Sequence, residues 1–430
     1  MKRRRFILLL TILGWSGLDA QPVWHGYVMQ HTAFRVEKPQ DALLLRTRLR
    51  LNSEYSGENI YGYASLDFLN DAAKSDQTTL NLKALYLDIY SNYLDWRIGK
   101  QQVVWGKADG YFINDIVNPL DLSYFLLQDF DDIRMATTLV KNRLHFGNQS
   151  LEVVFIPEFR PTRLNFSGDW GFARPDSVVF NQQLINPIIP GSYLKIPLSY
   201  ADETIPRFSL RKAEWGLKLN TFVLGTDLSF IYLKIREDRP VYYKTMNFGQ
   251  GGLPISINLR PTHPWLQFYG INFSRPTGMF VWRGEGGYFP HRFFDIENPT
   301  YLPAGGIVKK PFWQGMLGVD YQLTTNLDIG VQGIHEEIVD YESGIHEARR
   351  NNIGTLMLKG HFVNETVLPL LLTLYNFEDD SYLMRLMVDW NYADNFTISA
   401  GLDILGGKSS SLFGQFDRND NLYFKIVYSF

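Results

Sequence analysis

Charged side chains of opposite sign gather in two separate stretches of the chain. Residues 105–134 carry six aspartates and only two cations, Lys107 and Arg134; the six are Asp109, Asp115, Asp121, Asp129, Asp131 and Asp132. In the other stretch, Arg46, Arg48 and Arg50 are spaced two apart, so a β-strand would place all three on one face. Facing rows of acids and arginines create a transverse field that can filter ions by charge. A filter is one interpretation of these residues, and an ordinary hydrated wall is the alternative.

The arginines lie in a segment that alternates strictly between apolar and polar residues. In "DALLLRTRLRLNSE", the apolar face is opposite the arginines and consists of Leu43, Leu45, Thr47, Leu49 and Leu51. Similar alternation occurs in "SYLMRLMVDWNY" and "NFTISAGLDIL", and no apolar run after residue 20 approaches eighteen residues. Repeated amphipathic segments of about ten residues are typical of transmembrane β-barrels. A soluble β-sandwich is the alternative, but it would need polar outer faces.

The breaks between these segments predict the strand number and the orientation. Short breaks fall near 54–58, 91–93, 146–149, 223–226, 274–278, 323–326, 363–366 and 391–395, and mostly longer breaks alternate with them. Outer-membrane barrels join strands by short periplasmic turns and longer external loops in this order. The pattern therefore predicts an all-β, antiparallel barrel of about 18 strands, or 16 if one weak pair is misread, with both ends periplasmic.

The two ends of the chain also indicate an outer-membrane protein of a Gram-negative cell. Residues 1–20, "MKRRRFILLLTILGWSGLDA", have the cationic, apolar and small-residue parts of a signal peptide. The last strand, "NLYFKIVYSF", is amphipathic and ends on Phe430, which resembles the signal that the barrel-assembly machinery recognises. Residues 21–430 are expected to form a single barrel domain, in contact with outer-membrane lipid and lipopolysaccharide.

A barrel of this size encloses an aqueous channel unless something fills it. Further charges predicted to face inward are Arg97, Lys212, Glu214, Lys218, Arg283, Glu285 and Arg385. Asn118, Pro119 and Asp121 are typical of a helix start, so a loop helix is predicted near 119–128. We expect residues 105–134 to fold into the lumen as a constriction or plug, with their acids facing Arg46, Arg48 and Arg50. The alternative is an external loop over the rim, and a second long external loop is expected at 158–207.

The segment also carries a family resemblance. "GKQQVVWGKADGYFINDIVNPLDL" followed by "DFDDIR" resembles the signature of a family of uncharacterised, porin-like outer-membrane barrel proteins of unknown function. In that family an arginine stands where this chain has Lys100, which retains the charge. The strong match covers residues 97–134, and the resemblance implies an outer-membrane barrel without supplying a substrate.

Catalytic and metal-dependent functions have little support in the sequence. The chain has no cysteine, which excludes disulfides and thiol chemistry, and it contains neither Gly-x-Ser-x-Gly nor His-Glu-x-x-His. "DFDD" at 129–132, "DRND" at 417–420 and the pairs His335-Glu336 and His346-Glu347 could gather oxygen or imidazole ligands, but none has the spacing of a known cage. We therefore expect no enzyme, cofactor or metal.

The charge balance argues against nucleic acid as a partner. Without residues 1–20, the 42 Lys and Arg fall by four to 38, the 45 Asp and Glu fall by one to 44, and the net charge is -6. The sequence thus predicts a channel for passive diffusion of small solutes, with the solute class left open between hydrophobic and anionic. The alternative is a non-conducting or gated barrel in an envelope export complex, and a homo-oligomer is compatible with both.

Overall fold

The computed structural model describes residues 21–73, 77–125, 127–181, 193–250, 254–297, 301 and 304–430. The expected signal peptide lies outside these residues. Within them, no helix combines the length and hydrophobicity that a membrane crossing requires.

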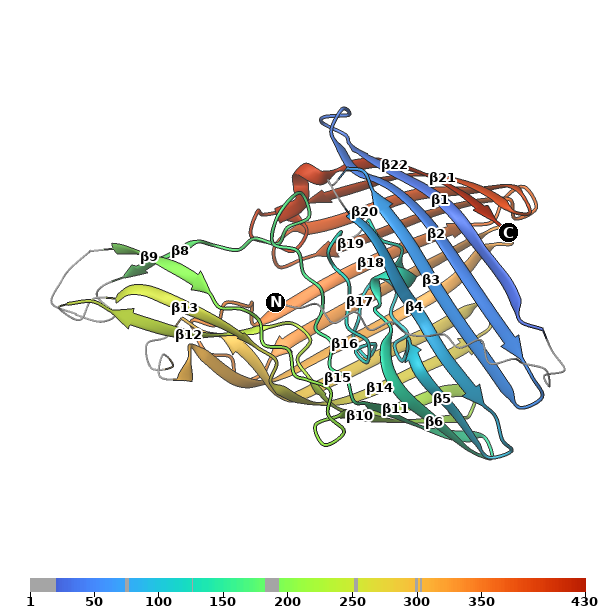
Figure 1. Cartoon of the computed structure of the whole chain (residues 1–430), viewed down its shortest axis with the longest axis horizontal. Helices are drawn as coiled ribbons and strands as arrows, with labels where there is room; N and C mark the ends of the chain where they lie inside the picture. The colour runs from blue at the N-terminus through green and yellow to red at the C-terminus, as the bar shows by residue number, and fades with distance from the viewer. Residues whose placement is uncertain are drawn as a thin grey trace, which may run out of the picture.

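Eighteen strands form one closed antiparallel barrel (Figure 1). Strand β22 pairs with β1, and the backbone groups of Gly26 and Phe430 exchange two hydrogen bonds, which closes the ring. The predicted count of eighteen is therefore confirmed over sixteen. In order round the ring the strands are β1 (Val23–Arg35), β2 (Ala42–Ser56), β3 (Ile60–Asp71), β4 (Gln77–Ile89), β5 (Leu94–Gln101), β6 (Thr137–Phe146), β7 (Gln149–Ile156), β10 (Glu214–Val223), β11 (Thr226–Arg236), β14 (Trp265–Thr277), β15 (Phe280–Asp295), β16 (Ile307–Thr324), β17 (Leu327–Ile338), β18 (Arg350–Gly360), β19 (Val367–Asn376), β20 (Ser381–Ala393), β21 (Phe396–Gly406) and β22 (Asn421–Ser429).

The predicted alternation of short and long connections is present. All eight short breaks are turns at the end of the barrel that carries the C-terminus, and the long connections meet at the other end, the loop end (Figure 1). Two long connections hold a second sheet that the sequence did not predict. Its strands run in the order β12 (Val241–Phe248), β13 (Pro254–Thr262), β9 (Tyr193–Tyr200) and β8 (Ser177–Asn181), and the sheet projects beyond the loop end.

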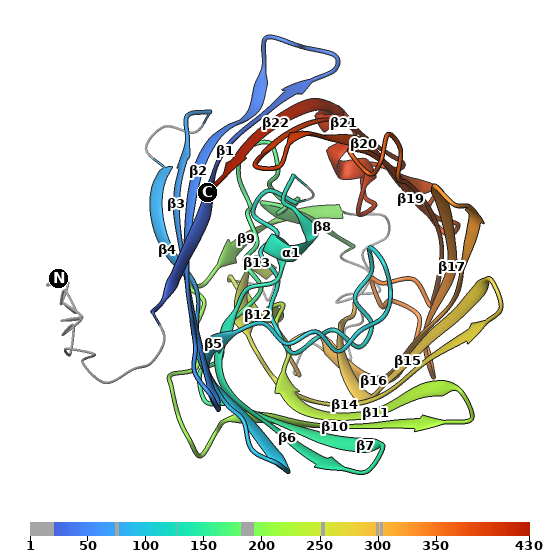
Figure 2. The ribbon, with the colours of Figure 1, turned by 90° about the vertical axis from the view of Figure 1, so that its right-hand side faces the viewer.

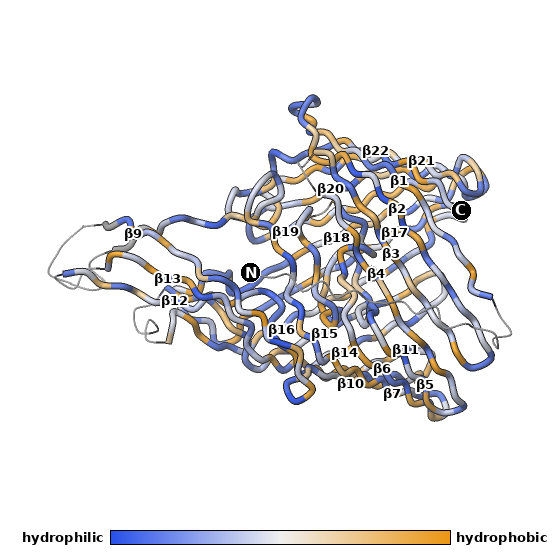
Figure 3. Tube along the Cα trace, viewed as in Figure 1, coloured by the Kyte–Doolittle hydropathy of each residue, from blue (hydrophilic) through white to orange (hydrophobic). Residues whose placement is uncertain are grey.

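The barrel strands alternate between hydrophobic and hydrophilic residues (Figure 3). On β22 and the terminal residue, the outward side chains Leu422, Phe424, Ile426, Tyr428 and Phe430 are 43–52 % exposed, whereas Tyr423 and Lys425 between them are buried. Apolar side chains on the outer wall and polar ones inside are what closure in a lipid bilayer requires. The strand faces predicted at the C-terminus are thus confirmed.

The predicted loop helix at 119–128 is wrong. Leu120 and Asp121 instead bridge to Arg134 and Arg163, and Phe125 has a positive φ of 47°. The backbone groups of this stretch bond across to neighbouring chain, so the bonding of a helix to the fourth preceding residue does not form. Among the described residues of this connection, the helix is a single turn that follows the predicted range, α1 (Phe130–Ile133).

Candidate functional site

Residues 102–136, which connect β5 to β6 and are called the lumen segment here, run inside the ring of strands (Figure 2). Asn118 ties the two ends of the segment together at its base. Its side chain accepts a hydrogen bond from the Val103 N–H (2.6 Å) and donates to the carbonyls of Gln101 (3.3 Å) and Met135 (3.0 Å). An asparagine suits this position because its amide both donates and accepts.

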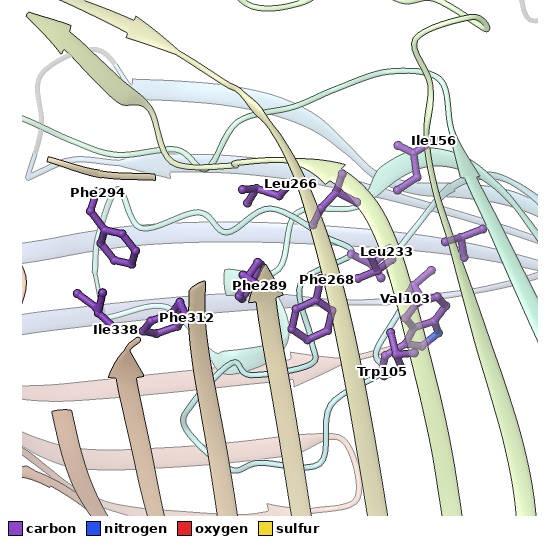
Figure 4. Close-up of a cluster of buried hydrophobic side chains, with 14 of the residues drawn as sticks. Val103, Trp105, Ile156, Leu233, Leu266, Phe268, Phe289, Phe294, Phe312 and Ile338 are labelled. Carbon is purple, nitrogen blue, oxygen red and sulfur yellow. The ribbon is translucent and has the colours of Figure 1, made fainter. Parts of the chain in front are cut away.

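Trp105 and Gly106 fix the entry of the segment into the lumen. Trp105 is buried in an apolar cluster on the inner wall, where Figure 4 shows it beside Val103, near Phe268 and Leu233. A Cβ on Gly106 would come within 2.8 Å of the Asp115 Cβ, so no larger residue fits without displacement of the chain. Apolar packing on the wall therefore holds this part of the segment, in addition to its polar contacts.

Glu285 on β15 is the first charged anchor of the segment. Its carboxylate accepts hydrogen bonds from the backbone N–H groups of Lys107, Ala108 (2.6 Å) and Asn114 (3.0 Å). Hydrogen bonds to an ionised carboxylate are stronger than those between neutral groups. Three of them here satisfy backbone N–H donors that would otherwise lack an acceptor. The first half of the segment is thus fixed to one carboxylate.

Neighbouring strands add contacts to this anchor. Arg283 on β15 pairs with Asp109, and Gln332 on β17 donates to the same aspartate (3.0 Å). The Tyr111 hydroxyl donates to Glu336 on β17 (2.8 Å). Burial, together with Glu336, raises the pKa of Tyr111, which remains a neutral donor.

Asp132 is the second charged anchor. It pairs with Arg48 and with Arg50 (3.0 Å) on β2 and with Lys83 on β4 (2.8 Å). Burial alone would raise the pKa of Asp132, but Arg48, Lys83 and Arg50 outweigh burial and hold it well below its usual range. Asp132 is therefore an anion bound by three cations, in direct contact rather than across the expected gap.

The other acids of the segment have other partners. Asp129 pairs with Lys425 on β22, and Asp121 pairs with Arg163 (2.7 Å) of the external connection. Asp115 pairs with Arg134 inside the segment, although burial still raises its pKa. The Asp131 side chain lies outside the described residues. Of the five described acids, only Asp132 meets the arginines of β2, so the expectation that the acids as a group face them is wrong.

The basic residues predicted for the lumen lie on the inner face of the wall, except Lys212, which is exposed in the connection before β10, so its predicted position is wrong. Arg97 and Arg385 each make two hydrogen bonds to a neighbouring aspartate, Asp88 and Asp403 respectively. Arg46 is different: its guanidinium lies over the Tyr124 ring, 4.1 Å from the ring centre, and its buried Nε has no hydrogen-bond partner among the described residues. Arg46 thus remains a cation beside the lumen segment without a neutralising carboxylate contact at Nε.

An aromatic cluster covers the lumen segment towards the loop end. Phe125 contacts Trp170 and Phe172 of the long external connection, with ring centres 6.2 and 5.8 Å apart. It also contacts Phe413 and Phe416, which come from the connection between β21 and β22. Two external connections therefore pack onto the segment from above.

The sequence-based metal alternatives find no support in the side-chain positions. Among the described residues, no group of three or more His, Asp or Glu side chains is close enough to hold an ion.

The family model described as "Protein of unknown function (DUF1302)" matches residues 47–354, more than half of the chain. The chain belongs to this family. The resemblance found at residues 97–134 is therefore confirmed, and the DUF1302 match extends it over most of the barrel. A search of curated proteins finds no match.

Solved structures share the barrel fold of this DUF1302 protein. Pseudomonas aeruginosa OccK2 (OpdF), solved in complex with glucuronate, is 8% identical with a TM-score of 0.51, and the match covers 96% of this chain and 98% of that one. Pseudomonas aeruginosa OccD3 (OpdP) is 8% identical with a TM-score of 0.50, over 96% and 92% of the two chains. At such low identity the likeness shows the fold alone.

Sequence reasoning missed several residues that hold the lumen segment of this DUF1302 protein. Lys83, Glu152, Asn272 and Lys425 all contact it. Each lies on a strand at an inward position, so their direction was predictable from alternation. Their partners were not, because the path of the segment through the lumen depends on tertiary packing.

Proposed function

We propose that this protein is an outer-membrane channel for passive diffusion of small solutes, constricted by the lumen segment. The observation that carries the proposal is the position of the two anchors. Arg48 and Arg50 lie on β2, the second strand of the ring, and Glu285 lies on β15, the eleventh, so the two strands are nine positions apart in a ring of eighteen. A segment held at both ends in this way crosses the lumen and narrows it.

The charge in the lumen supports small anions as the preferred solutes. Arg46 has an unpaired Nε, and its cross-strand neighbour His31 has a buried Nε2 that likewise lacks a hydrogen-bond partner among the described residues. The Arg46 cation beside the constriction attracts anions, since the field of a few fixed charges decides which ions enter a narrow pore. No catalytic arrangement enters this proposal.

Reversal potentials across a planar bilayer with a salt gradient test the proposal. Wild-type protein is expected to conduct steadily and to prefer chloride over potassium. Arg46→Gln should reduce that preference, whereas Arg275→Gln, the same change at an exposed site near the short turns, should leave it unchanged. A cation-selective wild-type channel would contradict the anion preference, and absence of conductance would contradict the channel.

The second candidate is a gated barrel that serves an envelope transport complex. The aromatic cluster around Phe125 favours it, because two external connections would have to separate before the outer mouth of the lumen opens fully. A wild-type protein that is silent in bilayers until Phe125 and Trp170 are replaced would support this candidate. Contacts with the barrel-assembly machinery, and a homo-oligomer, are proposed on the sequence evidence alone.

A further inference from the structure

A groove runs along the wall of the barrel near the loop end, over strands β15 to β18. Its volume is about 500 Å³, which is within the range of ligand-binding pockets. Trp313 and Leu317 of β16 border one side of it and Phe377, which follows β19, borders the other. These three residues take no part in the lumen site, but the lining also includes Glu285 and Met316, whose side chains contact the lumen segment from the inner face.

The groove is on the outer, lipid-facing side of the wall. On β16, Gln314 and Met316 point inward, because Gln314 donates to the Ile113 carbonyl of the lumen segment and Met316 packs against Ile113. Alternation then places Trp313, Gly315 and Leu317 outward. Leu317 is accordingly 58 % exposed, as expected of a side chain in the apolar belt.

Glycines make the floor of the groove. Gly315, Gly333 and Gly354 come from three adjacent strands, and Gly333 pairs with Leu317 on one side and with Gly354 on the other. A Cβ built on Gly333 meets no atom within 4 Å, so the space above it is open. The strand pairing under the groove is continuous, so the wall shows no lateral opening there.

The end of the groove nearest the loops is polar. His335 accepts or donates a 2.6 Å hydrogen bond with Asn352, and Asn352 also donates to Glu378 (2.6 Å). Next to them, Arg349 and Arg350 share the single carboxylate of Glu337, at 3.2 and 3.1 Å, and their side chains are 57 % and 56 % exposed. Two exposed guanidinium groups thus share one directly bonded carboxylate, while the second carboxylate at this end, Glu378, accepts from Asn352.

We infer that the groove binds lipopolysaccharide, with one acyl chain lying over the glycine floor and a phosphate group held at Arg349 and Arg350. The medium outside a barrel wall is lipid, so an apolar recess there is filled by a chain of the surrounding leaflet. Polar residues on a lipid-facing wall are costly unless they meet polar partners, and His335 with Asn352 would meet the sugar headgroup. In the predicted orientation, with both ends of the chain periplasmic, the loop end of the barrel faces the leaflet that contains lipopolysaccharide.

Charge and shape favour this occupant over the others. A second copy of the chain would present its own convex outer wall, which fits a recess floored by glycine backbone less well than a single acyl chain does. A neutral lipid would offer no anion to the two exposed guanidinium groups, which share a single carboxylate. A phosphorylated glycolipid satisfies both the apolar floor and the cationic end.

Native mass spectrometry of the detergent-purified, full-length mature protein, titrated with deep-rough lipopolysaccharide, tests the inference. Gly333→Leu fills the groove at a site with free space. Gly62→Leu is the matched control, since Gly62 also occupies an outward position of a barrel strand, β3. A Cβ at Gly62 would lie 3.8 Å from the nearest atom, which is an ordinary contact distance. Heat-dependent migration on gels verifies that both variants form barrels.

We expect wild type and Gly62→Leu to hold one lipopolysaccharide molecule with equal affinity, and Gly333→Leu to bind at least tenfold more weakly. Arg349→Gln with Arg350→Gln should also weaken binding. Equal binding by Gly333→Leu and wild type would overturn the inference, as would equally tight binding of phosphatidylglycerol. A change in oligomeric state on Gly333→Leu, without a change in lipid binding, would assign the groove to a second copy of the chain and overturn it too.

Discussion

Arg48 and Glu285 stand nine strands apart in a ring of eighteen and hold opposite ends of the same segment. Arg48 binds the Asp132 carboxylate, and Glu285 accepts the N–H groups of residues 107, 108 and 114. Because the two anchors lie on opposite walls, neither can release the segment without leaving it attached at the other. In the proposed function, the lumen segment narrows the lumen between these two fixed points.

Loss of the Glu285 charge should loosen the first half of the segment. Glu285→Gln replaces an anionic acceptor by an amide that brings its own N–H donors towards three backbone N–H groups. We expect docking of this half of the segment to weaken by about 1.5–3 kcal/mol. The population of molecules in which it is undocked would then rise roughly ten- to hundredfold. The chain has no cysteine, so Val117→Cys is a clean reporter: buried in wild type, it should react correspondingly faster with a small thiol reagent.

Glu336→Gln is the matched control for this substitution, because Glu336 lies on a nearby strand and contacts the segment through the Tyr111 hydroxyl. Its effect on labelling of Val117→Cys should be smaller. Equal labelling rates in the two variants would show that Glu285 has no special part in anchoring.

Neutralisation of Asp132 should release the second half of the segment. The Asp132 side chain is 7 % exposed, and Asp132→Asn leaves Arg48, Arg50 and Lys83 without their shared anion. Breaking such a buried pair costs about 3–5 kcal/mol, whereas an exposed pair contributes about 0–1 kcal/mol. Asp129→Asn, at a side chain that is 50 % exposed, is the comparison. Single-channel recordings should show many more transient openings for Asp132→Asn, and equal traces for the two variants would refute this assignment.

The same anchor predicts how the channel responds to pH. The pKa of Asp132 is lower in the docked segment than the value of about 3.9 in a free one, so ionisation favours docking. Docking is thus complete above about pH 5 and weakens as the pH falls below about 4. The pKa of Asp115 is raised, so protonation of Asp115 favours docking and opposes the effect of Asp132. Asp115 is present in both wild type and Asp132→Asn, so its effect cancels in the comparison. As the pH falls below about 4, conductance should rise more for wild type than for Asp132→Asn.

The strand pattern could be predicted from the sequence because each barrel strand meets lipid on one side and polar groups on the other. Leu49 faces outward and its neighbour Arg50 faces inward, as this requirement predicts. The short turns are found where the alternation breaks. Phe430 at the end of an amphipathic strand closes against Gly26, as the barrel requires. These features depend on local sequence and on whether each strand face meets lipid or polar groups, and the hydrophobic pattern of the sequence indicates both.

The interior could not be predicted in the same way. Asn118 has the residue type of a helix cap, yet it braces the base of the lumen segment through Gln101 and Met135. Asp109 and Asp129 look equivalent to Asp132 in the sequence, but they meet Arg283 and Lys425 on other walls. The second sheet depends on pairing between two distant connections, β9 with β13, which no local pattern records.

The most direct test of the central claim is single-channel conductance of wild type and of a form in which a short Gly-Ser linker replaces residues 108–131. Strands β5 and β6 are adjacent, so the remaining flanks and a linker can join them. A constricting lumen segment predicts steady conductance in wild type and a larger steady conductance in the deletion form. Equal conductance in both would contradict a constriction by this segment, and silence in both would contradict a channel.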